Sequence, residues 1–136
     1  MALLDKDLVA SAHAAYLRGD GEPLLALMDD DMYDNVSQQS GKAVWLVVLD
    51  WLEQSFAETS VEVNLAAADG DRVITWLTLT GTHVGSGFPW LRGRPPSNRR
   101  ITWRQVHIFR VTETQVVEHW AVRDDLRVLE AIDAPA

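Results

Sequence analysis

Two consecutive apolar runs near the end of the chain constrain its fold more than any other feature. The runs occupy residues 99–111 and 115–125, and both are rich in β-branched and aromatic residues, which suit a pleated, half-buried surface. Thr112, Glu113 and Thr114 join them in a short polar turn that continues neither run. The pattern therefore predicts a β-hairpin against which the rest of the chain must pack.

The predicted hairpin carries polar side chains among large aromatic ones. The polar residues are Gln105, His107, His119 and Asp124, and the aromatic residues are Trp103, Phe109 and Trp120. A mostly apolar wall with a few orienting polar groups is typical of a small-molecule site. We therefore expect the functional site to lie on this hairpin.

Helical periodicity dominates the first half of the chain. Apolar residues recur at helical spacing over Leu3–Arg18, Leu24–Met28 and Lys42–Ala57, which predicts three N-terminal helices. Met32–Val36, before the third helix, is predicted to be extended, with Tyr33 and Asn35 on one side because alternate residues of a strand share a face. The triplet Asp29-Asp30-Asp31 is expected to be a solvated turn.

The middle of the chain predicts two strands, a loop and, further on, a terminal helix. Ser60–Ala68 alternates apolar and polar residues, and Arg72–Thr82 has apolar residues of both parities, as in a strand covered on both faces. His83 is expected to hydrogen-bond the loop that follows. That loop, residues 85–98, is long enough to be functional or mobile, and its Phe88-Pro89-Trp90 segment is a candidate lid. Leu126–Ile132 predicts a short helix.

Composition excludes several classes of protein. A chain of 136 residues, 47% hydrophobic, has room for one core, so we expect a single domain over residues 1–136. A net charge of −8 argues against binding to nucleic-acid phosphates, and the longest apolar run, 43–49, is far shorter than the roughly 20 residues of a membrane span. The chain has no cysteine and no basic-then-apolar N-terminal stretch, so a cytoplasmic location is expected. Without metal-ligand spacing or a glycine-rich phosphate loop, we expect neither metal nor cofactor.

Four short motifs carry a family resemblance. They are Gly81–Gly85, Pro95–Arg100, Gln105–His107 and Val117–Trp120. Together with the order of the predicted elements, they are similar to the SnoaL-like polyketide cyclases of the nuclear transport factor 2-like superfamily, over Leu4–Ile132. The resemblance implies an α+β fold in which a strongly curved antiparallel sheet forms a cone-shaped barrel with three N-terminal helices. It also implies a cofactor-independent cyclase of polyketide or related secondary metabolism, such as antibiotic biosynthesis, which closes a ring on a hydrophobic substrate in the cone cavity.

The resemblance also assigns candidate catalytic residues. In the family's aldol cyclases, a histidine and a glutamine on one strand, an asparagine near the third helix and an aspartate on the final strand line the cavity. The first three match His107, Gln105 and Asn35. Ala121 stands in the place of the aspartate that removes the substrate proton, and Asp124 matches a second, more distal acidic position.

Since alanine cannot transfer a proton, His107 is the expected base. Its ordinary pKa near 6.5 needs the smallest shift for this task. Gln105, on the same strand face, would hold a substrate oxygen, and Asn35 would donate to a developing enolate. A core histidine bonded to a backbone carbonyl is the alternative for His107.

Strand parity leaves the roles of His119 and Asp124 open. On an ideal strand they fall on opposite faces, so both line one cavity only if a bulge intervenes, and Asp124 has Arg123 and Arg127 as alternative partners. Tyr33 and Asn35 also match the pair with which limonene epoxide hydrolase-like members position water. The substrate-binding candidates are Tyr33, Trp51, Trp90, Trp103, Phe109 and His119.

Three functions remain open at this point. The first is the cyclase; the second is a non-catalytic ligand-binding or dimerisation module that has lost the family's acid at Ala121; the third is an epoxide hydrolase or hydroxylase of the same fold. Because the fold usually pairs through its outer sheet face, a homodimer is expected. The outward residues of the hairpin's first strand would form the contact: Thr102, Arg104, Val106, Ile108 and Arg110.

Overall fold

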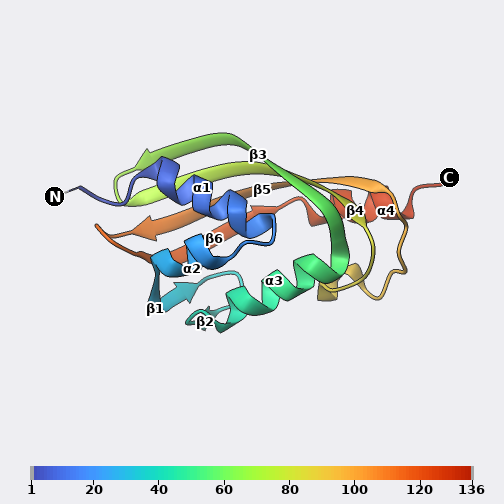
Figure 1. The fold of residues 1–136 in the computed structure, drawn as a ribbon, viewed down its shortest axis with the longest axis horizontal. Helices are drawn as coiled ribbons and strands as arrows, with labels where there is room; N and C mark the ends of the chain where they lie inside the picture. The colour runs from blue at the N-terminus through green and yellow to red at the C-terminus, as the bar shows by residue number, and fades with distance from the viewer. Residues whose placement is uncertain (1, 136) are drawn as a thin grey trace.

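The computed structural model describes residues 2–135 and contains helices α1 to α4 and strands β1 to β6 (Figure 1). In chain order the elements are α1 (Lys6–Leu17), α2 (Glu22–Leu27), β1 (Met28–Asp34), β2 (Gln39–Ser40), α3 (Ala43–Ser55), β3 (Phe56–Asp69), β4 (Arg72–His83), a 3-10 turn (Pro89–Leu91), β5 (Arg100–Val111), β6 (Val116–Arg123) and α4 (Asp125–Asp133). The three predicted N-terminal helices and the C-terminal hairpin are confirmed.

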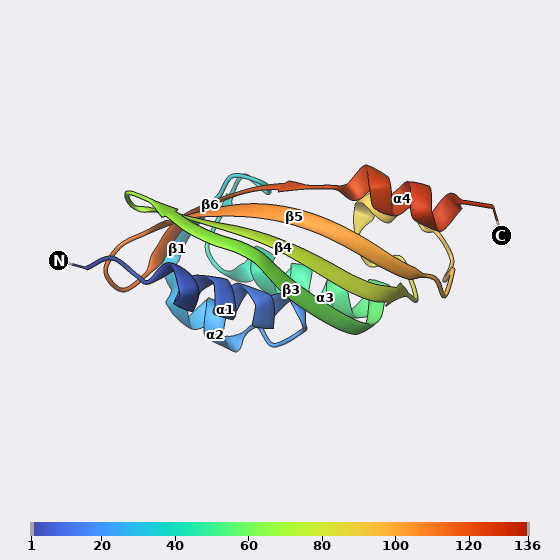
Figure 2. The ribbon, with the colours of Figure 1, turned by 90° about the horizontal axis from the view of Figure 1, so that it is seen from above.

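The strands form one curved, unclosed sheet in the order β2-β1-β6-β5-β4-β3. Neighbouring strands are antiparallel except β1 and β6, which run parallel. Figure 2 shows α1, α2 and α3 together on one side of this sheet, with α4 near the opposite end of the molecule from the N-terminus. The predicted α+β class and curved sheet are confirmed, with β1 added in parallel at one side.

Capping and alternation explain the local structure of the main elements. The Asp5 carboxylate caps α1 by accepting from the backbone N–H groups of Asp7 and Leu8. Strand β5 alternates exposed and buried residues almost along its whole length, which is the signature of a sheet with one face on the core. The buried face packs against α1 and α3 and builds the main hydrophobic core.

Two local expectations are corrected by the structure. The acidic triplet at 29–31 is not a turn but part of β1, in the irregular stretch between Met28 and Tyr33, the residues that pair with β6. Strand β4 is not covered on both faces within the chain, because its burial alternates and Trp76 on the outer face is 43% exposed. The expected contact of His83 is confirmed: its Nδ1 lies 2.9 Å from the Ser97 hydroxyl in the following loop.

The register of β5 against β6 determines which side chains lie opposite each other on the core face of the sheet. The directly paired residues are Gln105 with Arg123, His107 with Ala121, and Phe109 with His119. In the parallel pair, Asp34 of β1 lies opposite His119. Three neighbouring strands therefore bring ionisable side chains to one patch of the sheet.

Candidate functional site

A cavity lies between this patch of the sheet and helices α1 and α3. The space in it that is open to the centres of water-sized molecules is about 60 Å³. Its wall is mostly apolar and aromatic, with a small number of polar groups, as expected of a small-molecule site. The polar and ionisable residues in the lining are His13, Tyr16, Asp34, Gln105, His107, His119 and Arg123.

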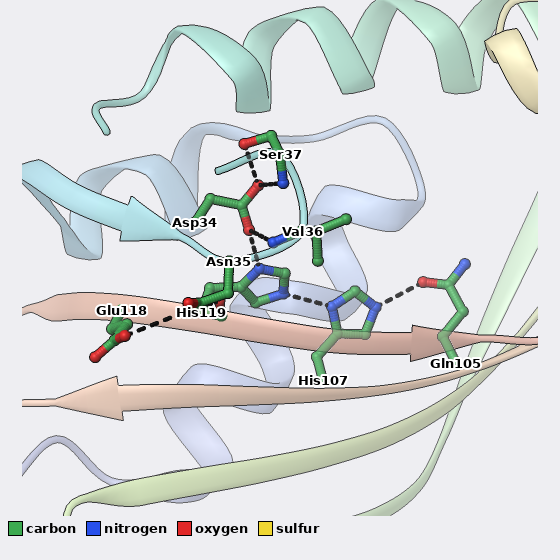
Figure 3. Close-up of polar contacts among 8 residues, drawn as sticks. All are labelled: Asp34, Asn35, Val36, Ser37, Gln105, His107, Glu118 and His119. Carbon is green, nitrogen blue, oxygen red and sulfur yellow. Dashed lines mark hydrogen bonds and ion pairs between the residues drawn. The ribbon is translucent and has the colours of Figure 1, made fainter. Parts of the chain in front are cut away.

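A continuous chain of hydrogen bonds crosses the floor of the cavity (Figure 3). Asp34 Oδ1 lies 2.7 Å from His119 Nδ1, and His119 Nε2 lies 2.8 Å from His107 Nδ1. His107 Nε2 in turn lies 2.7 Å from Gln105 Oε1. All four side chains are buried. We call this set of four residues the relay.

The direction of hydrogen bonding along the relay depends on one proton. With Gln105 Oε1 accepting, His107 Nε2 and His119 Nε2 each donate, and a third proton lies between His119 Nδ1 and Asp34. With the Gln105 amide turned to donate, each imidazole donates from Nδ1 towards Asp34, which is then a carboxylate. The two arrangements therefore differ by one proton, and they differ in the direction of the bonds between Gln105 and His107 and between His107 and His119.

Burial keeps the relay in its proton-poor form near neutral pH. Desolvation lowers the pKa of His107 well below its ordinary value, and the charges of His13, His119 and Arg123 lower it further. Desolvation also lowers the pKa of His119, although Asp34 opposes this shift. Burial alone would raise the pKa of Asp34, but hydrogen bonds from His119 and Ser37 outweigh it, so the pKa is lowered and Asp34 stays ionised.

Asp34 is held in place by its own loop as well as by His119. Its carboxylate accepts from the Ser37 hydroxyl at 2.7 Å, from the Ser37 backbone N–H at 3.1 Å and from the Val36 backbone N–H at 3.3 Å. A carboxylate with this many donors has a fixed orientation. It therefore fixes the tautomer and the ring plane of His119.

His13 of α1 is a third buried imidazole at the site. Its ring meets the His107 ring edge-on with centroids 4.2 Å apart, and its Nδ1 lies 3.0 Å from the Thr75 hydroxyl. Burial lowers the pKa of His13 to about 3, so it is neutral under ordinary conditions. Its Nε2 has no hydrogen-bond partner among the described residues.

The structure brings several of the predicted site residues together. Gln105, His107, His119 and Trp103 line the cavity. Phe109 lies behind them, with its ring stacked on His107 at 6.2 Å between centroids. The alternative for His107, a hydrogen bond to a backbone carbonyl, is wrong, because both of its ring nitrogens have side-chain partners.

Two tryptophans expected at the site lie one layer back from the cavity. Trp90 packs on Trp103, with ring centroids 5.2 Å apart, and Trp51 packs on Phe88 at 5.6 Å. Phe88 itself is buried and lines the cavity, so the candidate lid segment supplies part of the wall.

The structure places Asn35, Tyr33 and Asp124 away from the cavity lining. Asn35 Nδ2 donates to Glu118 Oε2 at 3.1 Å and to the His119 backbone oxygen at 3.0 Å, and Tyr33 is 38% exposed. Alternation along β1 points Asp34 inward and its neighbours outward. Asp124 is exposed at the start of α4, so it does not share a face with His119.

Sequence reasoning missed four polar residues of the site: His13, Tyr16, Asp34 and Arg123. Arg123 was signalled by period-two spacing from His119 and Ala121 on β6. Asp34 was hidden because its strand pairs in parallel with a segment 85 residues away. His13 sits in an ordinary amphipathic pattern, and nothing in the sequence separates it from a packed core residue.

This fold and site define a class of protein: a small α+β domain whose curved, unclosed sheet carries an apolar cavity over a buried network of ionisable side chains. The chain belongs to the SnoaL-like polyketide cyclase family, whose model matches residues 6–132. Nogalonic acid methyl ester cyclase of Streptomyces nogalater is 30% identical over 81 residues, which cover 59% of this chain and 58% of that relative. The chain thus spans less than two thirds of the length of that curated relative.

Solved structures give the same result for the fold. AclR from Streptomyces galilaeus, a candidate hydroxylase, superimposes with a TM-score of 0.77 at 26% identity, covering 96% of each chain. IdmH from Streptomyces antibioticus, a candidate polyketide cyclase, gives a TM-score of 0.72 at 26% identity, covering 90% of this chain and 94% of IdmH.

Among residues 2–135, no helix is long and apolar enough to span a membrane, and no three acidic or histidine side chains cluster as a metal centre would require.

Proposed function

We propose that this protein is a cofactor-independent cyclase that closes a ring on a polyketide-like hydrophobic substrate by acid/base catalysis. The observation that carries the proposal is the relay Asp34–His119–His107–Gln105 inside an apolar cavity. Three ionisable groups in line, each fixed by the next, supply a base, a group that orients it and a carboxylate to balance its charge.

His107 Nε2 acts as the base once the bound substrate has displaced Gln105 from it, because a ring nitrogen has a single lone pair. It takes the proton from the activated carbon of the substrate, and the electron pair of that C–H bond moves to the neighbouring carbonyl oxygen to give an enolate. The enolate carbon then forms a bond to a second carbonyl carbon, and the resulting alkoxide oxygen takes the proton back from His107. The catalyst is regenerated, and no external reductant or oxidant is consumed.

Asp34 supplies the negative charge that the family places at the position of Ala121. It reaches the base through His119 rather than by touching the substrate, so it is a positioning residue. When His107 gains a proton, its Nδ1–H donates to His119, whose Nδ1–H donates to Asp34, and the carboxylate stabilises the new imidazolium. His119 transmits this effect.

The test is a pH–rate profile of the wild type, His107→Ala and Asp34→Asn on a panel of anthraquinone-type and other polyketide esters, followed by chromatography. Loss of a general base should reduce kcat/KM roughly 10²-fold to 10⁴-fold. Because burial lowers the pKa of His107, the acid limb of the wild-type profile should lie below pH 6.5. Asp34→Asn should lower kcat and move this limb to still lower pH, because it removes the charge that favours the protonated relay.

Unchanged turnover in His107→Ala would reject the base assignment. A wild type that binds members of the panel without converting them, and gains turnover only as Ala121→Asp, would identify the protein as a binding module. Arg127→Gln is the control, because Arg127 is exposed on α4, away from the cavity and from the outer sheet face.

A hydroxylase is the second candidate, favoured by the likeness to AclR over almost the whole chain. Mass spectrometry separates the two reactions. A ring closure of the aldol type gives a product of the same mass as the substrate or one that has lost water, whereas hydroxylation adds one oxygen atom.

The proposal includes a cytoplasmic homodimer. The outer sheet face supports it, because Trp76, Val106 and Val122 are 43%, 38% and 77% exposed there, next to the residues expected at the contact. An exposed apolar group of this kind marks an interaction surface. Light scattering should give twice the chain mass at micromolar concentration, and Val106→Glu should give the monomer; a wild-type monomer would remove this part of the proposal.

A further inference from the structure

Beside the relay, the cavity is lined by the small side chain of Ala121. On β6 the residues His119, Ala121 and Arg123 share the cavity face, and on β5 Gln105 and His107 lie opposite Arg123 and Ala121. The small Ala121 side chain is therefore framed by larger polar ones. We call this part of the cavity the Ala121 recess.

Arg123 brings a positive charge to the recess. Its side chain is 22% exposed, and its guanidinium lies over the Trp103 ring, 5.6 Å from the centroid. The charge of Arg123 acts across the cavity, because it contributes to lowering the pKa of both His107 and His119. A half-buried cation that faces an apolar cavity costs free energy unless a partner compensates its charge.

Pairing with Asp125 does not account for this arginine. The single contact between Arg123 and Asp125 is 3.5 Å long, and the other oxygen of Asp125 accepts from Trp103 Nε1 at 2.9 Å. Arg94 shows how the same protein builds a full pair, because its Nε and one terminal nitrogen reach the two oxygens of Asp133 at 2.8 and 2.7 Å. Arg123 makes one long contact where a guanidinium can make a two-pronged one.

Gln105 is the second polar group at the recess. It is 3% exposed, yet its Nε2 has no hydrogen-bond partner among the described residues. In the reversed amide orientation one N–H goes to His107, and the second remains available. A buried amide donor without a partner is costly and indicates a missing acceptor.

We propose that the substrate is a carboxylic acid whose carboxylate binds in the Ala121 recess, between Arg123 and Gln105. A carboxylate matches the planar fork of an arginine, and it would satisfy both donors with two oxygens. It would also anchor the substrate beside His107, with the apolar body against Trp103 and Phe88. The inference rests on the proposed use of this cavity, and it separates this chain from its relative, which is named for a methyl ester.

The test compares a carboxylic acid with its methyl ester, using anthraquinone-2-carboxylate and its ester as unreactive probes. Dissociation constants follow from quenching of tryptophan fluorescence, since Trp45 and Trp103 line the cavity. A charge-assisted pair in a desolvated site should favour the acid roughly 10-fold to 100-fold in the wild type. Arg123→Gln should abolish this preference while the ester still binds, which also shows that the variant is folded.

Three further variants sharpen the result. Arg127→Gln makes the same change of charge at an exposed position on α4 and should keep the preference for the acid. Ala121→Asp should weaken acid binding more than ester binding, because it places a negative charge in the recess. Ala121→Asn, of similar volume, should weaken both equally. If Arg123→Gln does not fold, the two Ala121 variants decide the question.

Equal affinity of the wild type for acid and ester, or an equal loss of both in Arg123→Gln, would overturn the inference. Because binding is read without turnover, its failure differs from failure of the cyclase proposal. A wild type without acid preference whose turnover still requires His107 would reject only the carboxylate.

Discussion

Consecutive residues of β6 take part in two contacts between a nitrogen and a carboxylate, of nearly equal length, in opposite surroundings. His119 faces the cavity and lies 2.7 Å from Asp34, with side chains 5% and 7% exposed. Glu118 faces outward and lies 2.9 Å from Arg110, with side chains 23% and 38% exposed. The geometry is similar, and only the solvent differs.

The difference shows that burial, more than distance, decides what a polar contact does. At the outer pair, water screens the charges and replaces either partner when the other is removed. At the buried pair no water can take that place, so the loss of Asp34 leaves His119 and the loop donors without an acceptor. The inner contact can thus control protonation of the base, and the outer one cannot.

The largest expected effect on stability comes from breaking the inner contact. Asp34→Ala removes the acceptor of His119, Ser37 and Val36 and should lower the free energy of unfolding by roughly 2–4 kcal/mol, measured by urea denaturation at pH 7. Asp34→Asn keeps the shape and should cost less. A loss below that of Glu118→Ala would contradict the comparison.

A smaller effect should appear as a pH dependence of stability. The lowered pKa of His13, about 3, means that the unfolded chain binds a proton below pH 6.5 while the folded chain does not. Above pH 6.5 both states are neutral at His13 and the free energy of unfolding is not reduced. As the pH falls below 6.5, proton uptake by the unfolded chain lowers the free energy of unfolding by roughly 1.4 kcal/mol per pH unit. The pKa values of His107 and His119 are also lowered, so these residues likewise reduce stability as the pH falls.

Urea denaturation of the wild type and His13→Gln at pH 7, 6 and 5 measures this slope. The variant should lose stability more slowly on acidification by about 1.4 kcal/mol per pH unit. Asp34 titrates in a separate window, because its lowered pKa gives stability that is present above about pH 4 and lost only below it. Parallel slopes for the two proteins would show that His13 is not held neutral by the fold.

The smallest effect is expected at the outer contact. Glu118→Gln keeps an acceptor for only one of the two donors, Asn35 Nδ2 and Arg110 Nε. Water can take the place of the lost acceptor at this part-exposed contact, so the free energy of unfolding should change by about 0.5 kcal/mol or less. Added salt should reduce even this difference. A loss comparable to that of Asp34→Ala would mean that the outer face is covered in solution, as the proposed dimer predicts for its centre.

The hairpin and its cavity face could be predicted from the sequence because alternation is a local property. Period-two spacing put Gln105 and His107 on one face, and parity separated His119 from Asp124, as the structure has them. The same rule predicted that Tyr33 and Asn35 share a side. It could not say that this side faces away from the cavity.

The remaining decisions needed the tertiary structure. Which residue of β1 enters the cavity depends on a parallel pairing with β6 whose register shifts between Met28 and Tyr33, and no local pattern encodes that shift. The family resemblance therefore pointed to Asn35, while the chain places Asp34 beside His119. The helix face that presents His13 to His107 is likewise fixed by packing against the sheet.

The sequence by itself determined the helices, the C-terminal hairpin and the row of side chains on β5, since these follow from spacing along the chain, and its motifs indicated the family. The tertiary structure alone decided that a carboxylate from β1 completes the relay and that Arg123 stands beside Ala121 at the cavity. The physical reason is that hydrogen bonding and desolvation act between atoms close in space, and the atoms of this site come from segments up to about a hundred residues apart.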